Sequence, residues 1–138
     1  MNRIDVLGVG IDDLTREEAV ERALRLIGEH RSAYMVTPNP EIVMAAWGSE
    51  AVSTAINNAD LVIPDGIGVI LAAKLLKPPL KVRLPGIDIA ADILERLNET
   101  GGSVYILGGR PGVAAKAAEN VSKQCPCIKI AGTHDGYL

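Results

Sequence analysis

The chain is poor in aromatic side chains: its 138 residues include no Phe, one Trp and three Tyr. Because 48% of the residues are hydrophobic, the core must be built from Val, Ile, Leu and Ala. Aliphatic cores of this kind are typical of parallel sheets covered by helices. The length fits one domain, and we expect residues 1–138 to form a single ligand-binding domain.

An excess of positive charge is also missing, since the formal net charge is −3. Proteins that bind nucleic acid normally present a basic face to the phosphate backbone. The charge therefore argues against a nucleic-acid partner. It leaves small anionic ligands open, because two or three cations and some backbone amides are enough to bind them.

Cysteine is scarce, with only Cys125 and Cys127 on either side of Pro126. This number excludes the disulfide framework of a small secreted protein. A tetrahedral metal site would need two more ligands, and the only histidines are His30 and His134. We favour two reduced thiols and expect no metal at this position.

No run of about 20 apolar residues, the length needed to span a bilayer, occurs in the sequence. The first seven residues also lack the long apolar region of a secretory signal peptide. We therefore expect the protein to be located in the cytoplasm.

Short aliphatic runs alternate with helical patterns along the chain, which predicts an α/β fold. Parallel strands joined by helices of this length imply a Rossmann-like, open and mostly parallel sheet with helices on both faces. Helix 67–76 is apolar on all sides, which indicates full burial, an oligomer interface or a membrane-facing patch. The expected strands are 4–9, 33–36, 61–63, 104–107 and 128–131, and the expected helices are 15–28, 40–47, 49–57, 67–76, 87–98 and 111–123.

Two helix starts have clear capping signals. Thr15 and Glu18 have the spacing of a capping box, in which each side chain bonds the backbone of the other. Asn39 followed by Pro40 is typical of an N-cap followed by the first helical residue. Both signals predict where the flanking loops end.

In open parallel sheets, ligands bind beyond the carboxyl ends of the strands, and polar residues follow two strands here. Asp65 is either a helix cap or a general base. Asn39 is either the N-cap or a substrate-binding residue. Thr37 precedes Pro38, which holds it extended, so its hydroxyl would face the crevice.

The glycine-rich segment that begins at Gly108 and Gly109 follows a strand and opens a helix. Such a segment lets a phosphate approach the backbone, although it can equally be a tight turn. Tyr137 could stack on a base or pack against an expected continuation of the chain after Leu138, and His134 fits an ordinary loop residue. The G-x-G-x-x-G fingerprint of dinucleotide-binding proteins is not met, which disfavours a Rossmann-type oxidoreductase.

Arg83, in a proline-rich loop, could neutralise a departing diphosphate or simply be solvated. Asp12 and Asp13 could form an acidic metal motif, but their position before Thr15 favours a turn and helix start.

Five motifs occur in order, and together they resemble the WecG/TagA/CpsF glycosyltransferase family. The resemblance covers nearly the whole chain and is closest to the TagA branch. The motifs are Thr37-Pro38-Asn39-Pro40-Glu41, Pro64-Asp65-Gly66-Ile67-Gly68, Arg83-Leu84-Pro85-Gly86-Ile87-Asp88, Leu107-Gly108-Gly109 with Gly112-Val113-Ala114, and Gly132-Thr133-His134-Asp135-Gly136-Tyr137.

The resemblance implies transfer of N-acetylmannosamine from UDP-N-acetylmannosamine to the 4-hydroxyl of N-acetylglucosamine on undecaprenyl diphosphate. The anomeric configuration would invert, forming the β-1,4 bond of the wall teichoic acid linkage unit. It also implies no metal or other cofactor and a peripheral position at the inner face of the plasma membrane. We further expect a homo-oligomer.

The resemblance assigns roles to individual residues. Asp65 would deprotonate the acceptor hydroxyl, with Thr37 beside it at the catalytic position. Asn39 would help to hold donor or acceptor, and Arg83 would neutralise the leaving diphosphate. The nucleotide-binding residues would be Gly108, Gly109, Asp135, Gly136 and Tyr137.

The sequence departs from the family in one respect. Family members continue past the Gly-Tyr element with a Pro-Lys-Gln-Glu motif and a C-terminal appendage, which these 138 residues do not contain. We expect the chain to be truncated and inactive by itself. The alternatives are a family member that uses another UDP-sugar and a non-catalytic nucleotide-sugar-binding module.

Overall fold

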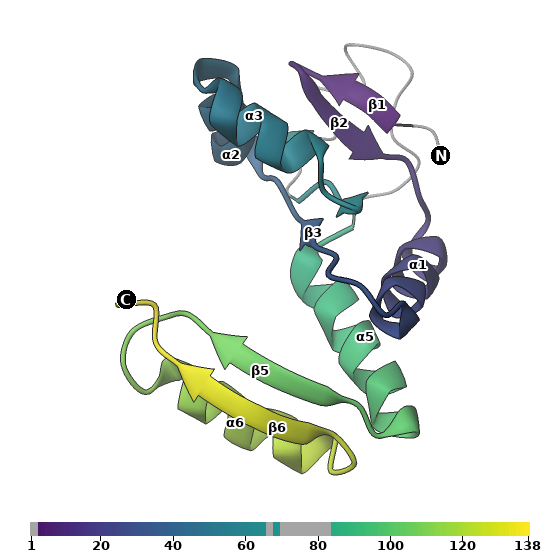
Figure 1. Ribbon diagram of the computed structural model, residues 1–138, viewed down its shortest axis with the longest axis vertical. Helices are drawn as coiled ribbons and strands as arrows, with labels where there is room; N and C mark the ends of the chain where they lie inside the picture. Colours follow the sequence, from purple (N-terminus) through teal and green to yellow (C-terminus); the bar gives the residue numbers. More distant parts are fainter. Residues whose placement is uncertain (1–2, 66–67, 70–83) are drawn as a thin grey trace. The chain divides into compact units, whose positions relative to one another are not determined.

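A computed structural model describes residues 3–65, 68–69 and 84–138 (Figure 1). The contacts between residues divide the chain into two compact units, Met1–Ala90 and Ala91–Leu138. Each unit is described by itself below.

The first unit opens with an antiparallel hairpin, in which β1 (Arg3–Val6) pairs with β2 (Val9–Asp12). The expected single strand over residues 4–9 is therefore wrong. Leu7 and Gly8 form the turn at φ 53° and 88°, a left-handed backbone that fits a two-residue hairpin turn. The sequence did not predict this turn, because Leu is rarely found at a turn position that requires a positive φ.

Three helices of the first unit begin at capping residues. α1 (Arg16–Gly28) starts after Thr15 with both hydrogen bonds of the capping box, as predicted. α2 (Pro40–Gly48) starts after Asn39, whose Oδ1 accepts the amide hydrogen of Ile42 at 2.9 Å. α3 (Glu50–Asn57) follows at once and is capped by Ser49.

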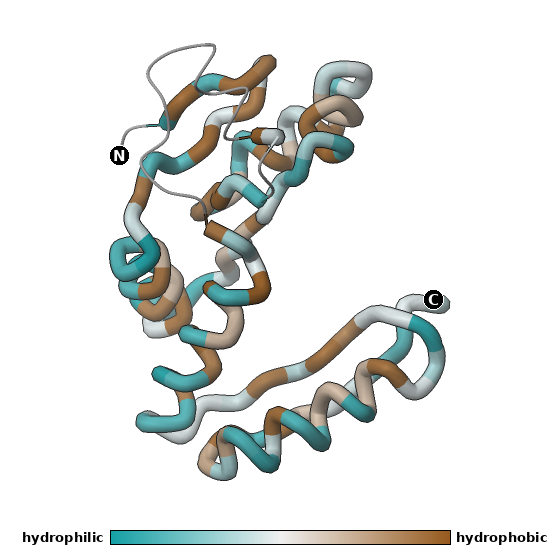
Figure 2. Tube along the Cα trace, turned by 180° about the vertical axis from the view of Figure 1, so that it is seen from behind, coloured by the Kyte–Doolittle hydropathy of each residue, from teal (hydrophilic) through white to brown (hydrophobic). Residues whose placement is uncertain are grey.

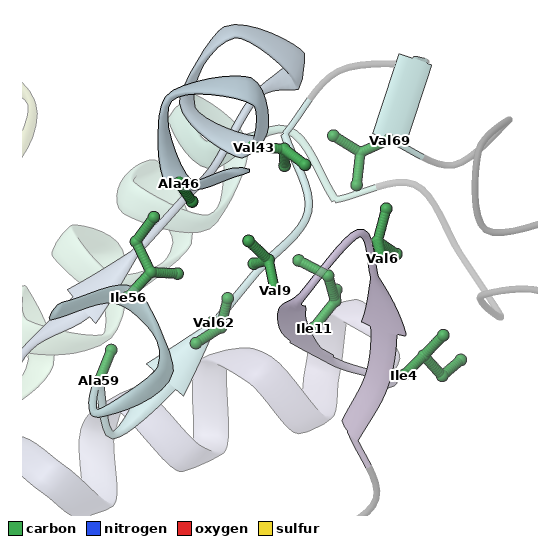
Figure 3. Close-up of a cluster of buried hydrophobic side chains, with 10 residues drawn as sticks. All are labelled: Ile4, Val6, Val9, Ile11, Val43, Ala46, Ile56, Ala59, Val62 and Val69. Carbon is green, nitrogen blue, oxygen red and sulfur yellow. The ribbon is translucent and has the colours of Figure 1, made fainter. Parts of the chain in front are cut away.

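Two short strands, β3 (Met35–Val36) and β4 (Leu61–Val62), pair in parallel after α1 and α3 respectively. The buried residues around them form the core of the unit together with the hairpin, α2 and α3 (Figure 3). The hydrophobic residues of both hairpin strands are visible along the chain in Figure 2. The core residues are Ile4, Val6, Val9, Ile11, Val43, Ala46, Ile56, Ala59, Val62 and Val69.

The helix α5 (Gly86–Thr100) begins in the first unit and continues into the second. In the second unit β5 (Ser103–Leu107) pairs in parallel with β6 (Lys129–His134), and α6 (Val113–Gln124) connects them and packs against both. The register shifts between Val104 and Tyr105. This strand–helix–strand order is the parallel arrangement expected from the sequence.

The predicted α/β class is therefore confirmed. β3 and β4 pair in parallel, and so do β5 and β6, as expected, whereas β1 and β2 pair antiparallel. The described residues form three two-stranded sheets, β1–β2, β3–β4 and β5–β6, and do not show the single open sheet that we expected. The expected helix 67–76 lies outside the described residues except for Gly68 and Val69.

Candidate functional site

The carboxyl ends of β3 and β4 lie side by side in the first unit. The hydrogen bonding between the two strands continues past their ends. The amide of Ile63 donates to the carbonyl oxygen of Val36 at 2.9 Å, and the amide of Asp65 donates to the carbonyl oxygen of Pro38 at 3.0 Å. Pro38 is buried, whereas Thr37, Asn39 and Asp65 are partly exposed. Three predicted polar residues are therefore brought to one edge.

Asn39 serves both as an N-cap and as part of this edge. Its Oδ1 atom is engaged with the amide of Ile42, whereas its Nδ2 hydrogens take no part in the cap. The side chain can therefore donate to a ligand while it caps α2. The two alternatives drawn from the sequence are compatible.

Thr37 lies against the first turn of α5. A Cβ atom added to Gly86 would lie 3.1 Å from Cγ2 of Thr37, so glycine permits this close approach. The amides of Asp88 and Ile89 donate to the carbonyl oxygen of Pro85, so in the first turn only the amides of Gly86 and Ile87 have no acceptor within the helix. Helix N-termini of this kind favour anionic groups.

Arg83 lies outside the described residues, so its expected role at this edge remains a prediction. Leu84, which follows it, is buried.

The expected turn and helix-start role of Asp12 is wrong. Asp12 is the last residue of β2 and its side chain is fully buried. One carboxylate oxygen accepts from Nε of Arg3 at 3.1 Å, and the other accepts the amide of Val62 in β4 at 2.8 Å. The carboxylate thus accepts a hydrogen bond from β4 that the carbonyl oxygen of a neighbouring strand would otherwise accept. The residue that donates it, Val62, lies three residues before Asp65.

Arg3 extends this network to the end of α3. Its guanidinium donates to the carbonyl oxygens of Asn57 at 2.8 Å and of Ala59 at 2.6 Å. Sequence reasoning missed the network because Arg3 and Asp12 look like ordinary surface charges. The one signal in the sequence is that Arg3 and Asp12 each stand next to a segment in which apolar residues alternate with other residues.

A second predicted group gathers at the carboxyl ends of β5 and β6 in the second unit. The amide of Gly108 donates to the carbonyl oxygen of His134 at 2.9 Å, and the amide of Gly136 donates to that of Gly109 at 2.8 Å. A Cβ atom on Gly136 would lie 3.3 Å from the oxygen of Gly109. The glycine-rich turn and the 135–137 segment are therefore in direct contact.

Asp135 shapes the end of this segment. Its Oδ1 accepts the amide hydrogen of Tyr137 at 2.9 Å, and Tyr137 is 68% exposed. His134 Nδ1 lies 2.6 Å from the carbonyl oxygen of Asp135. Tyr137 therefore offers an open aromatic face beside the glycine-rich turn, which suits stacking on a base.

The start of α6 faces the same turn. Gly112 is its N-cap at φ 91°, and no side chain caps the helix. The first-turn amides of Ala114 and Ala115 therefore have neither an intrahelical acceptor nor a cap. Backbone amides at such a helix start can bind phosphate oxygens.

Within residues 3–65, 68–69 and 84–138, no group of three or more His, Cys, Asp and Glu side chains is placed to hold a metal ion. No helix in the same ranges is long and apolar enough to cross a membrane. Cys125 and Cys127 form no disulfide. Independence from metals remains a prediction.

Comparison with known proteins gives curated relatives over most of the chain. An N-acetylglucosaminyldiphosphoundecaprenol N-acetyl-beta-D-mannosaminyltransferase of Bacillus spizizenii is 34% identical over 112 residues, which are 81% of this chain and 44% of the relative. A protein of the same name from Staphylococcus aureus is 33% identical over 138 residues, 99% of this chain and 54% of the relative. The chain thus spans about half the length of the curated relatives it matches.

The sequence profile of the Glycosyl transferase WecG/TagA/CpsF family matches residues 4–138, which include both groups of polar and glycine residues described above. Because this match extends over nearly all of the sequence, the chain belongs to the WecG/TagA/CpsF glycosyltransferase family.

Proposed function

We propose that the chain is the nucleotide-sugar-binding part of an inverting glycosyltransferase. The reaction transfers N-acetylmannosamine from UDP-N-acetylmannosamine to the 4-hydroxyl of N-acetylglucosamine on diphospho-undecaprenol. It forms the β-1,4 bond of the wall teichoic acid linkage unit. Family membership and the names of the relatives support this reaction class.

One observation carries the proposal: Asp65 and Pro38 are hydrogen-bonded neighbours, so Thr37, Asn39 and Asp65 share one edge of the first unit. Inversion proceeds by a single in-line displacement, which needs one base. The Asp65 carboxylate takes the proton of the acceptor hydroxyl as its oxygen attacks the anomeric carbon. The bond from that carbon to the diphosphate breaks, and UDP leaves with the electron pair.

The leaving diphosphate must be stabilised as its charge develops. Arg83 supplies a cation in this proposal, and the first turn of α5 beside Thr37 supplies backbone amides. Hydrogen bonds from Thr37 and from Nδ2 of Asn39 orient the sugars. These groups replace a metal ion, and no other cofactor is required.

The nucleotide is assigned to the second unit. A Cβ atom on Gly108 would meet nothing within 4 Å, so a ribose or phosphate can approach the backbone there. Gly136 lets its own segment lie against Gly109, which keeps the two loops of the nucleotide site together. Tyr137 stacks on the uracil ring, and Asp135 fixes the backbone that carries Tyr137.

The proposal is tested by Asp65→Asn in the intact protein. Loss of the base should lower kcat by about 10²- to 10⁴-fold, the usual contribution of general base catalysis, while the Kd for UDP-N-acetylmannosamine stays within about twofold. The matched control is Asp60→Asn, which removes a carboxylate just before the other end of β4. It should retain kcat.

A non-catalytic binding module would respond differently. Its function would survive Asp65→Asn with unchanged ligand affinity. A family member that uses another donor would lose turnover in Asp65→Asn but would prefer a different UDP-sugar in the transfer assay. Retention of full kcat by Asp65→Asn would exclude Asp65 as the base.

A further inference from the structure

An apolar pocket of about 80 Å³ lies between the hairpin and α2 in the first unit. None of its lining side chains carries a charge or a hydrogen-bonding group. Sites for whole small molecules usually measure about 300–1,000 Å³, so this pocket is too small for a nucleotide or a sugar. Its size and lining suit a short length of hydrocarbon. The lining residues are Val6, Leu7, Pro40, Val43, Met44, Gly68 and Val69.

Both chain segments that close the pocket lead directly from the candidate site. Pro40 follows Asn39, and Gly68 is the third residue after Asp65. A Cβ atom on Gly68 would lie 2.7 Å from Cγ of Pro40, so the two segments touch and only glycine fits there. A ligand whose polar head lies between Asn39 and Asp65 can therefore place an attached chain in the pocket.

Leu7, at the rim of the pocket, has an unfavourable backbone conformation that hydrogen bonds with Asn57 hold in place. Leu7 has φ 53°, a left-handed conformation that is unfavourable for a non-glycine residue. Asn57 fixes the turn, because its Nδ2 donates to the oxygen of Gly8 at 2.9 Å and its Oδ1 accepts the amide of Gly10 at 2.8 Å. The result is a hydrogen-bonded turn that presents Leu7 with 38% of the residue surface exposed.

The adjoining face of α2 is also apolar. Met44 is 58% exposed, and Trp47, one helical turn further on, is 67% exposed. Glu41 is the only charged residue of α2. Anionic membrane surfaces attract clusters of Lys and Arg, which this helix lacks, so the face suits a single hydrocarbon chain better than a charged bilayer surface.

We propose that this pocket, called here the Leu7 pocket, binds the first isoprene units of a polyprenyl diphosphate-linked acceptor. The inference rests on the proposed function, because that function supplies a polar head beside Asp65. It adds a binding site for the lipid part of the acceptor. Pro40, Met44 and Leu7 contact the chain, and Trp47 lies beside its exit from the pocket.

The chain contains its own reporters for a binding test. Trp47 is the only tryptophan, so its fluorescence reports on this face alone. Of the three methionines, Met44 lines the pocket and Met35 lies in β3 as an internal control. The 138-residue chain, labelled with ¹³C at the methionine methyl groups, is titrated with farnesyl diphosphate and, separately, with inorganic pyrophosphate.

Farnesyl diphosphate should shift the Met44 methyl resonance saturably, leave that of Met35 nearly unchanged and move the Trp47 emission to shorter wavelength. Pyrophosphate should move neither reporter. If Met44 does not respond, or responds equally to pyrophosphate, the proposal is wrong. Equal responses to phosphatidylglycerol vesicles without polyprenyl lipid, or to raised protein concentration without ligand, would also overturn it.

The variant Leu7→Asn removes the apolar rim without endangering the fold, because Asn tolerates positive φ better than Leu. It should weaken farnesyl diphosphate binding by about fivefold, as expected for losing part of a buried leucine contact, while the melting temperature stays the same or rises. Wild-type affinity in Leu7→Asn would contradict the proposal. The exposed Ile27→Asn variant in α1 is the control and should bind normally.

Kinetics in the intact protein separate this proposal from the proposed function. Leu7→Asn should raise KM for a long-chain acceptor by about fivefold, leave KM for a short-alkyl acceptor unchanged and preserve kcat. Equal effects on both acceptors would contradict the Leu7 pocket. Unchanged turnover in Asp65→Asn would instead overturn the assignment of the base and leave the farnesyl diphosphate result standing.

Discussion

The amide nitrogen of Asp65 donates a hydrogen bond of 3.0 Å to the carbonyl oxygen of Pro38. This bond continues the β3–β4 pairing beyond the strands, so the residues that follow each strand stay together. The backbone of Asp65 is thereby held beside Pro38, as the proposed role of its carboxylate requires. The position of a catalytic base needs this kind of rigid support.

Removal of the Asp12 carboxylate should be strongly destabilising. In Asp12→Ala the amide of buried Val62 loses its acceptor and Arg3 loses its charged partner. We expect the free energy of unfolding to fall by about 3–5 kcal/mol, measured by urea denaturation. The control Asp5→Ala removes an exposed carboxylate that accepts the amide of Gly8, and should cost about 1 kcal/mol or less. Similar losses in both variants would contradict the buried network.

Two substitutions at Asn39 separate its capping and binding roles. Asn39→Asp keeps an oxygen for the amide of Ile42 and places negative charge at a helix N-terminus, so stability should be kept or raised. It loses the Nδ2 donor, so KM should rise by about tenfold. Asn39→Ala should lower both stability, by about 1 kcal/mol, and activity. If Asn39→Asp behaves like wild type in transfer assays, Asn39 is only a cap.

A methyl group at Gly136 should disturb nucleotide binding. The added Cβ would lie 3.3 Å from the oxygen and 3.4 Å from the nitrogen of Gly109, so one of the two loops must shift. We expect Gly136→Ala to weaken UDP binding by about tenfold, measured by calorimetry. At Gly28 an added Cβ meets nothing within 4 Å, so Gly28→Ala is the control and should bind UDP normally. Normal UDP binding by Gly136→Ala would remove the nucleotide assignment of this loop.

The ion pair of Asp60 predicts a specific pH dependence. The pKa of Asp60 is lowered from 3.8, first by the hydrogen bond from the amide of Tyr34 and then by the bond from Arg31. A lowered folded-state pKa stabilises the protein above the unfolded pKa, and this contribution is lost as pH falls through the folded pKa. The melting-temperature difference between wild type and Asp60→Asn should therefore shrink below about pH 4. A constant difference from pH 7 to pH 2.5 would contradict this coupling.

Local signals in the sequence predicted the starts of α1 and α2 and the ends of β3 at Val36 and β5 at Leu107, whereas β6 continues to His134, beyond the expected end at residue 131. The capping box at Thr15 and the Asn39-Pro40 pair each place donors and acceptors within one helical turn, so their geometry follows from spacing alone. The meeting of Gly108 and Gly109 with Asp135 and Gly136 followed from the parallel pairing of β5 and β6.

Features that depend on distant partners could not be predicted in this way. Leu7 adopts its left-handed turn because Asn57, 50 positions further along the sequence, bonds the residues around it. Asp12 is buried only because Arg3 and the amide of Val62 converge on it. In both cases the partner lies on another element, and the residue itself gives no local signal.

The most direct test of the central claim is a structure of the intact protein bound to a non-hydrolysable UDP-N-acetylmannosamine analogue and a GlcNAc diphosphate acceptor. The account predicts a carboxylate oxygen of Asp65 within about 2.6–3.2 Å of the acceptor hydroxyl, on the face of the anomeric carbon opposite the diphosphate. Sugars bound with their reacting atoms away from Asp65, and with no contact to Thr37 or Asn39, would contradict it.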